Sequence, residues 1–230
     1  MNRSELLKVI DLALEEDIKG GDHSTLACIS SAEVGEAKLL VKQEGCLAGV
    51  AMAKIIFKHY DAEITFEDFI IDGAEVKPGD VAFKVKGKVH TILACERLVL
   101  NVMQRMSGIA TYTKFLNDKI KDTGAKLLDT RKTTPNFRIF EKEAVRIGGA
   151  VNHRFGLYDM IMLKDNHIDY AGGINKAILK TQTYLKEKGL NLKVEVEVRD
   201  LKELDQVLST GQIQRIMLDN FDPETMIIAV

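Results

Sequence analysis

A group of basic side chains suited to binding anions lies between residues 131 and 164 of this chain. Two of them are arginines, Arg131 and Arg154, whose guanidinium groups can each make two parallel hydrogen bonds to one carboxylate or phosphate. Several fixed donors are needed to replace the water around a polyanion, so the group predicts a ligand with more than one negative charge. Its members are Arg131, Lys132, His153, Arg154 and Lys164.

Carboxylates that could balance this positive charge follow as Glu195, Glu197 and Asp219. The two glutamates are two residues apart within VEVEV (194–198), so in a strand they share one face. Acids beside bases are typical of a polyanionic substrate bound with a divalent metal ion, or of a transition state that becomes cationic. Either glutamate could be the functional one, and we prefer Glu197 because it lies nearer the C-terminal end of the run.

The elements expected to position these residues are strands that alternate with helices. Helical patterns follow the apolar runs, which indicates βα units and a parallel sheet, either open or closed into a barrel. The polar residues come at or near the C-terminal ends of the runs, where such sheets bind ligands. The alternative is that they are solvated strand ends or ordinary ion pairs. The runs are 126–128, 160–163, 194–198 and 215–218, and the helices are 138–147, 174–188 and 201–208.

The first part of the chain, residues 1–107, reads instead as a mixed α+β domain. Apolar residues at helical spacing predict a helix to about residue 16, and alternation predicts a strand over 34–41. Turn pairs and alternation indicate β structure between 64 and 89. A helix is expected over 50–60, and another over 92–106 that stops at Ser107-Gly108 before a third over 109–122. Residues 108–230 would then form the second domain.

Composition excludes several classes of function. The 230 residues include 32 basic and 34 acidic side chains, and this net charge of −2 argues against a nucleic-acid binder. No apolar run is long enough to span a bilayer, so no membrane partner is expected. Three separated cysteines indicate free thiols in a reducing compartment, and hence a cytoplasmic protein. Rossmann, P-loop and nucleophile-elbow motifs are absent from the sequence.

The histidines outside the basic group read as ordinary side chains. His23, His59 and His90 are expected at the surface or half-buried. His153 could form a metal cluster with Asp165 and His167, but the spacing matches no zinc pattern.

Four motifs identify a resemblance to a known family. Together with matching segments along the rest of the chain, they closely resemble the quinolinate phosphoribosyltransferase family. The motifs are DTRKTTP (129–135), KEAVRIGG (142–149), NHRFGL (152–157) and LKDNHI (163–168). The further segments include ALEED (13–17), AGV (48–50), SGIAT (107–111) and MLDNF (217–221).

The resemblance implies a fold and a reaction. The fold would be an N-terminal α/β sandwich domain (1–107) followed by an incomplete, open α/β barrel (108–230) that is truncated at its C-terminus. The reaction would transfer phosphoribose from phosphoribosyl diphosphate to the ring nitrogen of quinolinate. Loss of a carboxylate would follow, giving nicotinate mononucleotide, pyrophosphate and CO₂ for NAD biosynthesis.

The resemblance also implies roles for individual residues. The quinolinate carboxylates would be held by Arg131, His153, Arg154 and Lys164, with Thr130 beside them. Lys132 and Lys164 would face phosphoribosyl diphosphate. Glu197 and Asp219 would bind the ribose hydroxyls or a hydrated Mg²⁺, and would favour positive charge at the anomeric carbon. Lys132, Glu197 and Asp219 are thus the expected catalytic residues.

The partners implied are the two substrates and further copies of the same chain. Arg97 would enter the active site of a neighbouring subunit, so a homodimer, or a higher oligomer such as a hexamer, would be required for function. Mg²⁺ would bind together with phosphoribosyl diphosphate.

The sequence departs from the family pattern at its end. It stops at Val230, inside an expected helix, whereas family members continue with at least two strands that carry phosphate-binding loops. A chain of this length is therefore expected to be poorly active and prone to aggregate. Two alternatives remain: a paralogue of the same fold associated with molybdate transport, and a catalytically dead oligomerisation partner.

Overall fold

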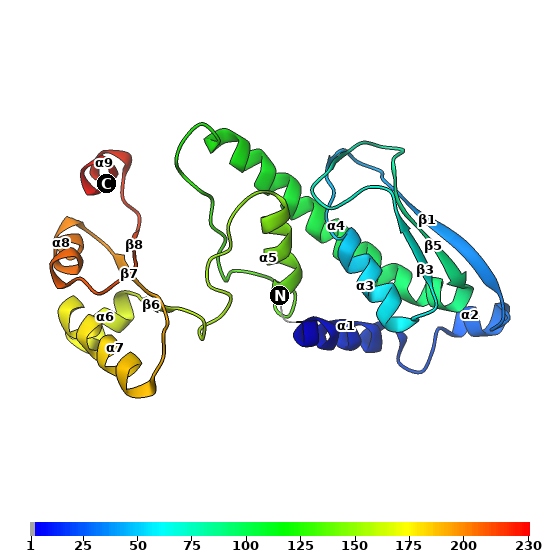
Figure 1. Cartoon of the computed structure of the whole chain (residues 1–230), viewed down its shortest axis with the longest axis horizontal. Helices are drawn as coiled ribbons and strands as arrows, with labels where there is room; N and C mark the ends of the chain where they lie inside the picture. The colour runs from blue at the N-terminus through cyan, green and yellow to red at the C-terminus, as the bar shows by residue number, and fades with distance from the viewer. Residues whose placement is uncertain (1–2) are drawn as a thin grey trace. The chain divides into compact units, whose positions relative to one another are not determined.

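The computed structural model describes residues 3–230, which fold into two compact units, one that ends at His153 and one that begins at Arg154 (Figure 1). Each unit contains both helices and strands, so the predicted α/β class is confirmed. The predicted domain boundary at residues 107 and 108 falls inside one long helix, α4 (Val89–Ile120). The division of the chain into domains at that point stays a prediction.

The sheet of the first unit is antiparallel, with strand order β1 (Val34–Leu40), β5 (Val81–Lys88) and β3 (Thr65–Asp68). A second pair is formed by β2 (Gly45–Cys46) and β4 (Glu75–Val76). These bounds confirm the predicted strand near 34–41 and the β structure between 64 and 89.

Four helices complete this part of the first unit. Helix α3 (Val50–Tyr60) packs against α4 and turns Phe57 toward the rings of Phe66 and Phe83, whose centroids lie 4.5 Å apart. The others are α1 (Arg3–Ile18) and α2 (His23–Cys28), and only α2 was not expected from the sequence. Asp22 caps α2 by accepting from the N–H groups of Ser24 and Thr25.

The predicted break at Ser107-Gly108 is wrong, because α4 continues through both residues. The hydroxyl of Ser107 bonds both the N–H and the carbonyl of Ala48, at 3.0 and 3.1 Å, so it ties α4 to a neighbouring segment instead of ending the helix. A glycine inside a helix costs only about 1 kcal/mol relative to alanine. The surrounding 32-residue helix outweighs that cost.

Two of the three cysteines are buried in this unit, and all three are free thiols as expected. Burial raises the pKa of the Cys95 thiol to about 12, and burial also raises the pKa of Cys46. Both thiols are therefore protonated and unreactive at neutral pH.

The end of the first unit carries helix α5 (Arg138–Ile147), which packs against α4. The strand predicted over 126–128 is wrong in extent, because Leu128 forms only an isolated parallel bridge to Val151. Its hydrogen bonds join Val151 N–H to Leu127 and Asp129 N–H to Val151, after which both segments turn into loops.

The second unit is a parallel sheet with strand order β6 (Ile161–Leu163), β7 (Val194–Val198) and β8 (Arg215–Leu218). This confirms three of the four predicted strands. Its helices are α6 (Asp165–Ala171), α7 (Ile174–Lys188), α8 (Leu201–Thr210) and α9 (Pro223–Ala229). The apolar core of this unit joins the central strand β7 to helices α7 and α8 through Ile178, Val196 and Leu204.

No helix in the described part of the chain combines the length and the apolar character needed to cross a membrane.

Candidate active site

The loop that carries Arg131 and Lys132 is held by one face of α5. Side chains at Arg138, Glu141 and Lys142 reach back to this loop, and their spacing places them on the same side of the helix. Glu141 and Lys142 are buried, so this face of α5 is a polar surface that binds the loop.

Arg138 fixes the middle of the loop. Its Nε donates to the hydroxyl of Thr133 at 2.9 Å, and a terminal nitrogen donates to the carbonyl of Arg131 at 3.3 Å. The second contact holds the backbone of Arg131 rather than its guanidinium group, which leaves that guanidinium available to a ligand.

Glu141 fixes the end of the loop. Its carboxylate accepts from the N–H of Thr134 at 3.2 Å, from the Thr134 hydroxyl at 2.9 Å and from Nε of Arg105 at 2.9 Å. Arg105 lies on α4, so the same carboxylate joins both helices to the loop.

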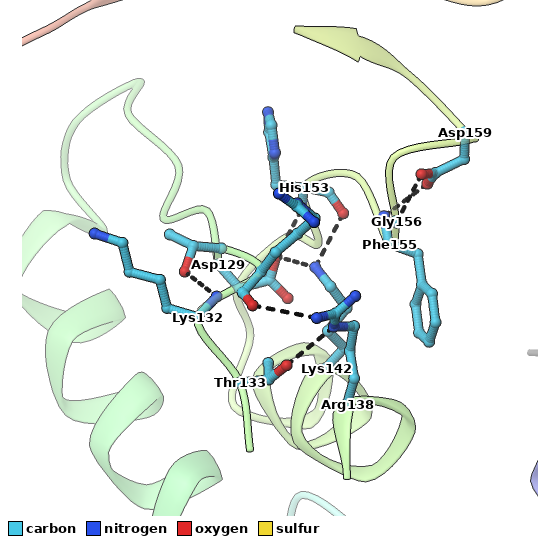
Figure 2. Close-up of polar contacts among 11 residues, drawn as sticks. Asp129, Lys132, Thr133, Arg138, Lys142, His153, Phe155, Gly156 and Asp159 are labelled. Carbon is cyan, nitrogen blue, oxygen red and sulfur yellow. Dashed lines mark hydrogen bonds and ion pairs between the residues drawn. The ribbon is translucent and has the colours of Figure 1, made fainter. Parts of the chain in front are cut away.

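The predicted ligands on this loop remain accessible. Thr130 is exposed, and its hydroxyl accepts from the N–H of Lys132 at 3.0 Å, which tightens the turn. The ammonium group of Lys132 makes no hydrogen bond or ion pair within residues 3–230, and Figure 2 shows its side chain extending away from the hydrogen-bonded cluster. An anion that arrives from solvent can therefore reach the ammonium group of Lys132.

The second unit brings Lys164 and Glu197 together. Lys164 follows β6 and Glu197 lies on the neighbouring strand β7, and their side chains form an ion pair of 2.7 Å. Glu197 is 12% exposed and Lys164 is 44% exposed, so the pair is open to solvent on the lysine side. Asp219 follows β8, and its N–H donates to the carbonyl of Val198 at 2.9 Å. These three predicted residues therefore lie along the edge of the parallel sheet that is formed by the C-terminal ends of its strands.

The structure separates the two glutamates of β7 by environment. The side chain of Glu195 is completely buried and accepts from Arg215 at 3.4 Å, whereas that of Glu197 meets Lys164 at the accessible edge. Arg199, the next basic residue, is bound by Glu203 and Asp169, and Glu203 raises its pKa. Arg199 is thus engaged in structural ion pairs.

Arg154 begins the second unit, and a terminal nitrogen of its side chain donates to the carbonyl of Met160 at 3.2 Å. The loop between them is closed by Asp159, whose carboxylate accepts from the N–H groups of Phe155 and Gly156 at 2.6 and 2.8 Å (Figure 2). The side chain of Arg154 is half-buried.

Arg97 lies on α4 with an exposed side chain. In the described part of the chain it makes no hydrogen bond or ion pair.

Among residues 3–230 no three His, Cys, Asp or Glu side chains are placed to hold a metal ion. His167 instead caps α6, because its Nδ1 accepts from the N–H of Lys164 at 3.0 Å. That bond places the imidazole proton on Nε2 in the neutral ring.

Comparison with known proteins decides the family. A model of the quinolinate phosphoribosyl transferase C-terminal domain matches residues 109–230, and the corresponding N-terminal domain model matches residues 22–107. The chain belongs to the quinolinate phosphoribosyltransferase family.

Members of this family are similar to the chain over nearly all of its length. A chloroplastic carboxylating nicotinate-nucleotide pyrophosphorylase of Arabidopsis thaliana is 47% identical, and a decarboxylating quinolinate phosphoribosyltransferase of Nicotiana tabacum is 45% identical. Each alignment covers 94% of this chain and 63% of the relative, so the chain spans less than two thirds of their length. The crystal structure of NadC from Streptococcus pyogenes matches 100% of this chain and 80% of its own, with a TM-score of 0.90 and 39% identity.

Sequence reasoning missed the residues that position the family motifs. From the sequence, Asp129 and Lys142 are recognised only as parts of the quinolinate phosphoribosyltransferase motifs, and Arg138 and Glu141 only as parts of the helix predicted over 138–147. A signal was present for three of them, because Arg138, Glu141 and Lys142 have the spacing of one helix face. Their partners could not be inferred, because a loop conformation decides which groups they meet.

Proposed function

We propose that this protein transfers phosphoribose from phosphoribosyl diphosphate to quinolinate, with loss of CO₂, to give nicotinate mononucleotide and pyrophosphate for NAD biosynthesis. The observation that carries the proposal is the edge of the parallel sheet where Lys164, Glu197 and Asp219 lie, in a chain of this family. It supplies a cation for the leaving group and two acids for the sugar.

Quinolinate binding is assigned to the cations and to one hydroxyl. Two carboxylates require several donors, and Arg131 stands on a loop that α5 holds in place. Arg154 is held by its bond to Met160. The proposed ligands of quinolinate are Thr130, Arg131, His153, Arg154 and Lys164, with Arg97 supplied by a second subunit.

Phosphoribosyl diphosphate is assigned to Lys132, Lys164 and the two carboxylates. The ammonium of Lys132, which has no partner among residues 3–230, can neutralise a departing pyrophosphate. Glu197 and Asp219 would bind ribose hydroxyls and favour the positive charge that develops at the anomeric carbon. The catalytic residues proposed are therefore Lys132, Glu197 and Asp219.

Mg²⁺ is proposed to enter with phosphoribosyl diphosphate. Two carboxylates at one sheet edge fit an ion that keeps most of its water ligands and is completed by substrate oxygens. When bound, the ion would offset charge on pyrophosphate.

The finer fold and the cellular context are also proposals. An α/β sandwich followed by an open, incomplete barrel is consistent with the antiparallel and parallel sheets of the two units. Assembly as a homodimer or a higher oligomer follows from the role proposed for Arg97. The cytoplasmic location stays a prediction, since relatives include proteins named as chloroplastic and mitochondrial.

Calorimetric titration with quinolinate tests the substrate. We expect quinolinate to bind at least about tenfold more tightly than nicotinate, which lacks one carboxylate, because a site built for two anions would leave donors unpaired. Arg131→Ala should abolish this preference. Equal affinity for the two acids, or no binding of quinolinate, would contradict the proposal.

Turnover is measured separately as CO₂ released from radiolabelled quinolinate. Release should require phosphoribosyl diphosphate and Mg²⁺, and should stop when a chelator removes the metal ion. Release that continues without phosphoribosyl diphosphate would point to a different reaction.

A further inference from the structure

A buried carboxylate at Asp129 accepts from three donors in two segments of the first unit, helix α5 and residues 152–153. Its Oδ1 accepts from Nζ of Lys142 at 2.5 Å and from the N–H of His153 at 2.8 Å. In the amide orientation that satisfies its neighbours, Asn152 donates to Oδ2 at 2.8 Å and to the carbonyl of Lys142 at 2.9 Å. The side chains of Asp129 and Lys142 are 8% and 3% exposed.

The ion pair grips the backbone of His153 on both sides of its Cα. Asp129 accepts the N–H of this residue, and Lys142 donates to its carbonyl at 3.1 Å (Figure 2). Holding both peptide groups fixes the backbone dihedral angles between them, and these angles set the direction in which the side chain leaves the chain. The direction of the Cα–Cβ bond of His153, from which the imidazole extends, is therefore fixed by these two backbone contacts.

Stability alone does not account for this arrangement. Removing two charges from water is costly, and apolar residues of similar volume often stabilise a protein core at least as well. Lys142 also stands on α5, beside the residues that hold the rest of the loop. A buried pair in which one member stands on a helix is well suited to placing a functional backbone accurately.

We propose that the Asp129–Lys142 ion pair is a positioning element that holds His153 for binding of quinolinate. This inference rests on the proposed function. Neither residue is expected to touch substrate, because both are buried and act through the peptide groups of His153.

The first test needs no ligand. In Lys142→Met we expect the amide of His153 to exchange hydrogen at least about tenfold faster, while amides in the buried part of α4 keep their rates. Should this variant fail to fold, the neutral double variant Asp129→Asn/Lys142→Met avoids an isolated buried charge and is measured in its place. Unchanged exchange at His153 in a folded variant would overturn the inference.

The second test separates positioning from a general loss of structure. Lys142→Met should weaken quinolinate binding at least about tenfold and change phosphoribosyl diphosphate binding little, and Lys142→Arg should recover part of the loss. In a His153→Ala background the same change should add almost nothing, because the group that it positions is already gone. Fully additive losses, or equal losses for both substrates, would overturn the inference.

The matched control is Glu143→Gln, which removes another α5 ion pair, that with Arg146. It should leave both the exchange rate at His153 and quinolinate affinity unchanged. A wild-type protein that binds no quinolinate contradicts the proposed function, whereas unchanged exchange in folded Lys142→Met contradicts the positioning inference itself.

Discussion

Glu195 and Glu197 show how two identical side chains on one strand face can differ in chemistry. Their two-residue spacing could not distinguish them in the sequence, because both point to the same side of β7. In the structure Glu195 is completely buried beside Arg215, and Glu197 lies at the sheet edge against Lys164. Only Glu197 is placed to meet a ligand that arrives from solvent.

Replacing Glu197 by glutamine should therefore affect mainly activity, and replacing Glu195 by glutamine should affect mainly stability. Glu197→Gln should lower the rate of CO₂ release about a hundredfold, because it removes a charge that favours the cationic transition state. Glu195→Gln should lower the free energy of unfolding by about 1–3 kcal/mol and leave that rate nearly unchanged, because it weakens a buried contact to Arg215. Initial rates and urea unfolding curves of both variants check this, and a larger loss of rate in Glu195→Gln would reverse the assignment.

At the scale of elements, α4 and α5 approach each other closely at Gly148, the residue that ends α5. A Cβ built there would lie 2.6 Å from the carbonyl oxygen of Ala110 and 2.6 Å from Cβ of Thr113, both on α4. The absence of a side chain at Gly148 thus lets the helix that holds the loop rest on the longest helix of the chain.

Gly148→Ala should lower the free energy of unfolding by about 1–3 kcal/mol, because neither contact can be relieved without moving backbone. Gly108→Ala is the matched control within α4. Gly108 is exposed, and apart from its chain neighbours and the backbone of its own helix no atom lies within 4 Å of a built Cβ, so alanine there should stabilise the protein by up to about 1 kcal/mol. Thermal and urea unfolding measure both changes, and a Gly148→Ala protein as stable as wild type would show that the helices can separate at little cost.

Most elements could be predicted from periodicity, and the errors have physical causes. Helix α3 and strands β5 to β8 follow patterns of apolar residues that local sequence displays directly. Ser107 and Gly108 read as a helix stop, because the contact of Ser107 with Ala48 joins residues far apart in the sequence. The same limit applies to the site: Arg131 and Lys132 could be named from the motif, but their support by α5 depends on the loop conformation.

At the scale of the whole molecule, the exposed side chain of Arg97 is consistent with a role in a second subunit. It stands on α4 and makes no hydrogen bond or ion pair among the described residues. An arginine that has no partner within residues 3–230 is available to an anion, and in an assembly that anion could lie in the active site of another subunit.

Mixing two inactive variants tests that role. Arg97→Ala and Arg131→Ala should each lack turnover, and a mixture allowed to exchange subunits should recover up to about a quarter of wild-type activity, because half of the dimers would be hybrids with one intact site each. Initial rates of the mixture after subunit exchange measure this, and a hybrid purified from differently tagged, co-expressed chains should reach about half of wild-type activity. An inactive hybrid would show that Arg97 acts within its own subunit or not at all.

The polar face of α5 also bears on how this enzyme family could be re-engineered. Arg138, Glu141 and Lys142 each bind a different part of the loop. Residues 129–153 therefore form one hydrogen-bonded segment that contains both the loop and the helix. Grafting the loop alone onto another scaffold would carry Arg131, the arginine proposed to bind quinolinate, without the α5 side chains that hold its loop. A successful transplant has to move the whole segment 129–153, and the new scaffold has to pack against α5 with a residue that replaces Arg105 as the partner of Glu141.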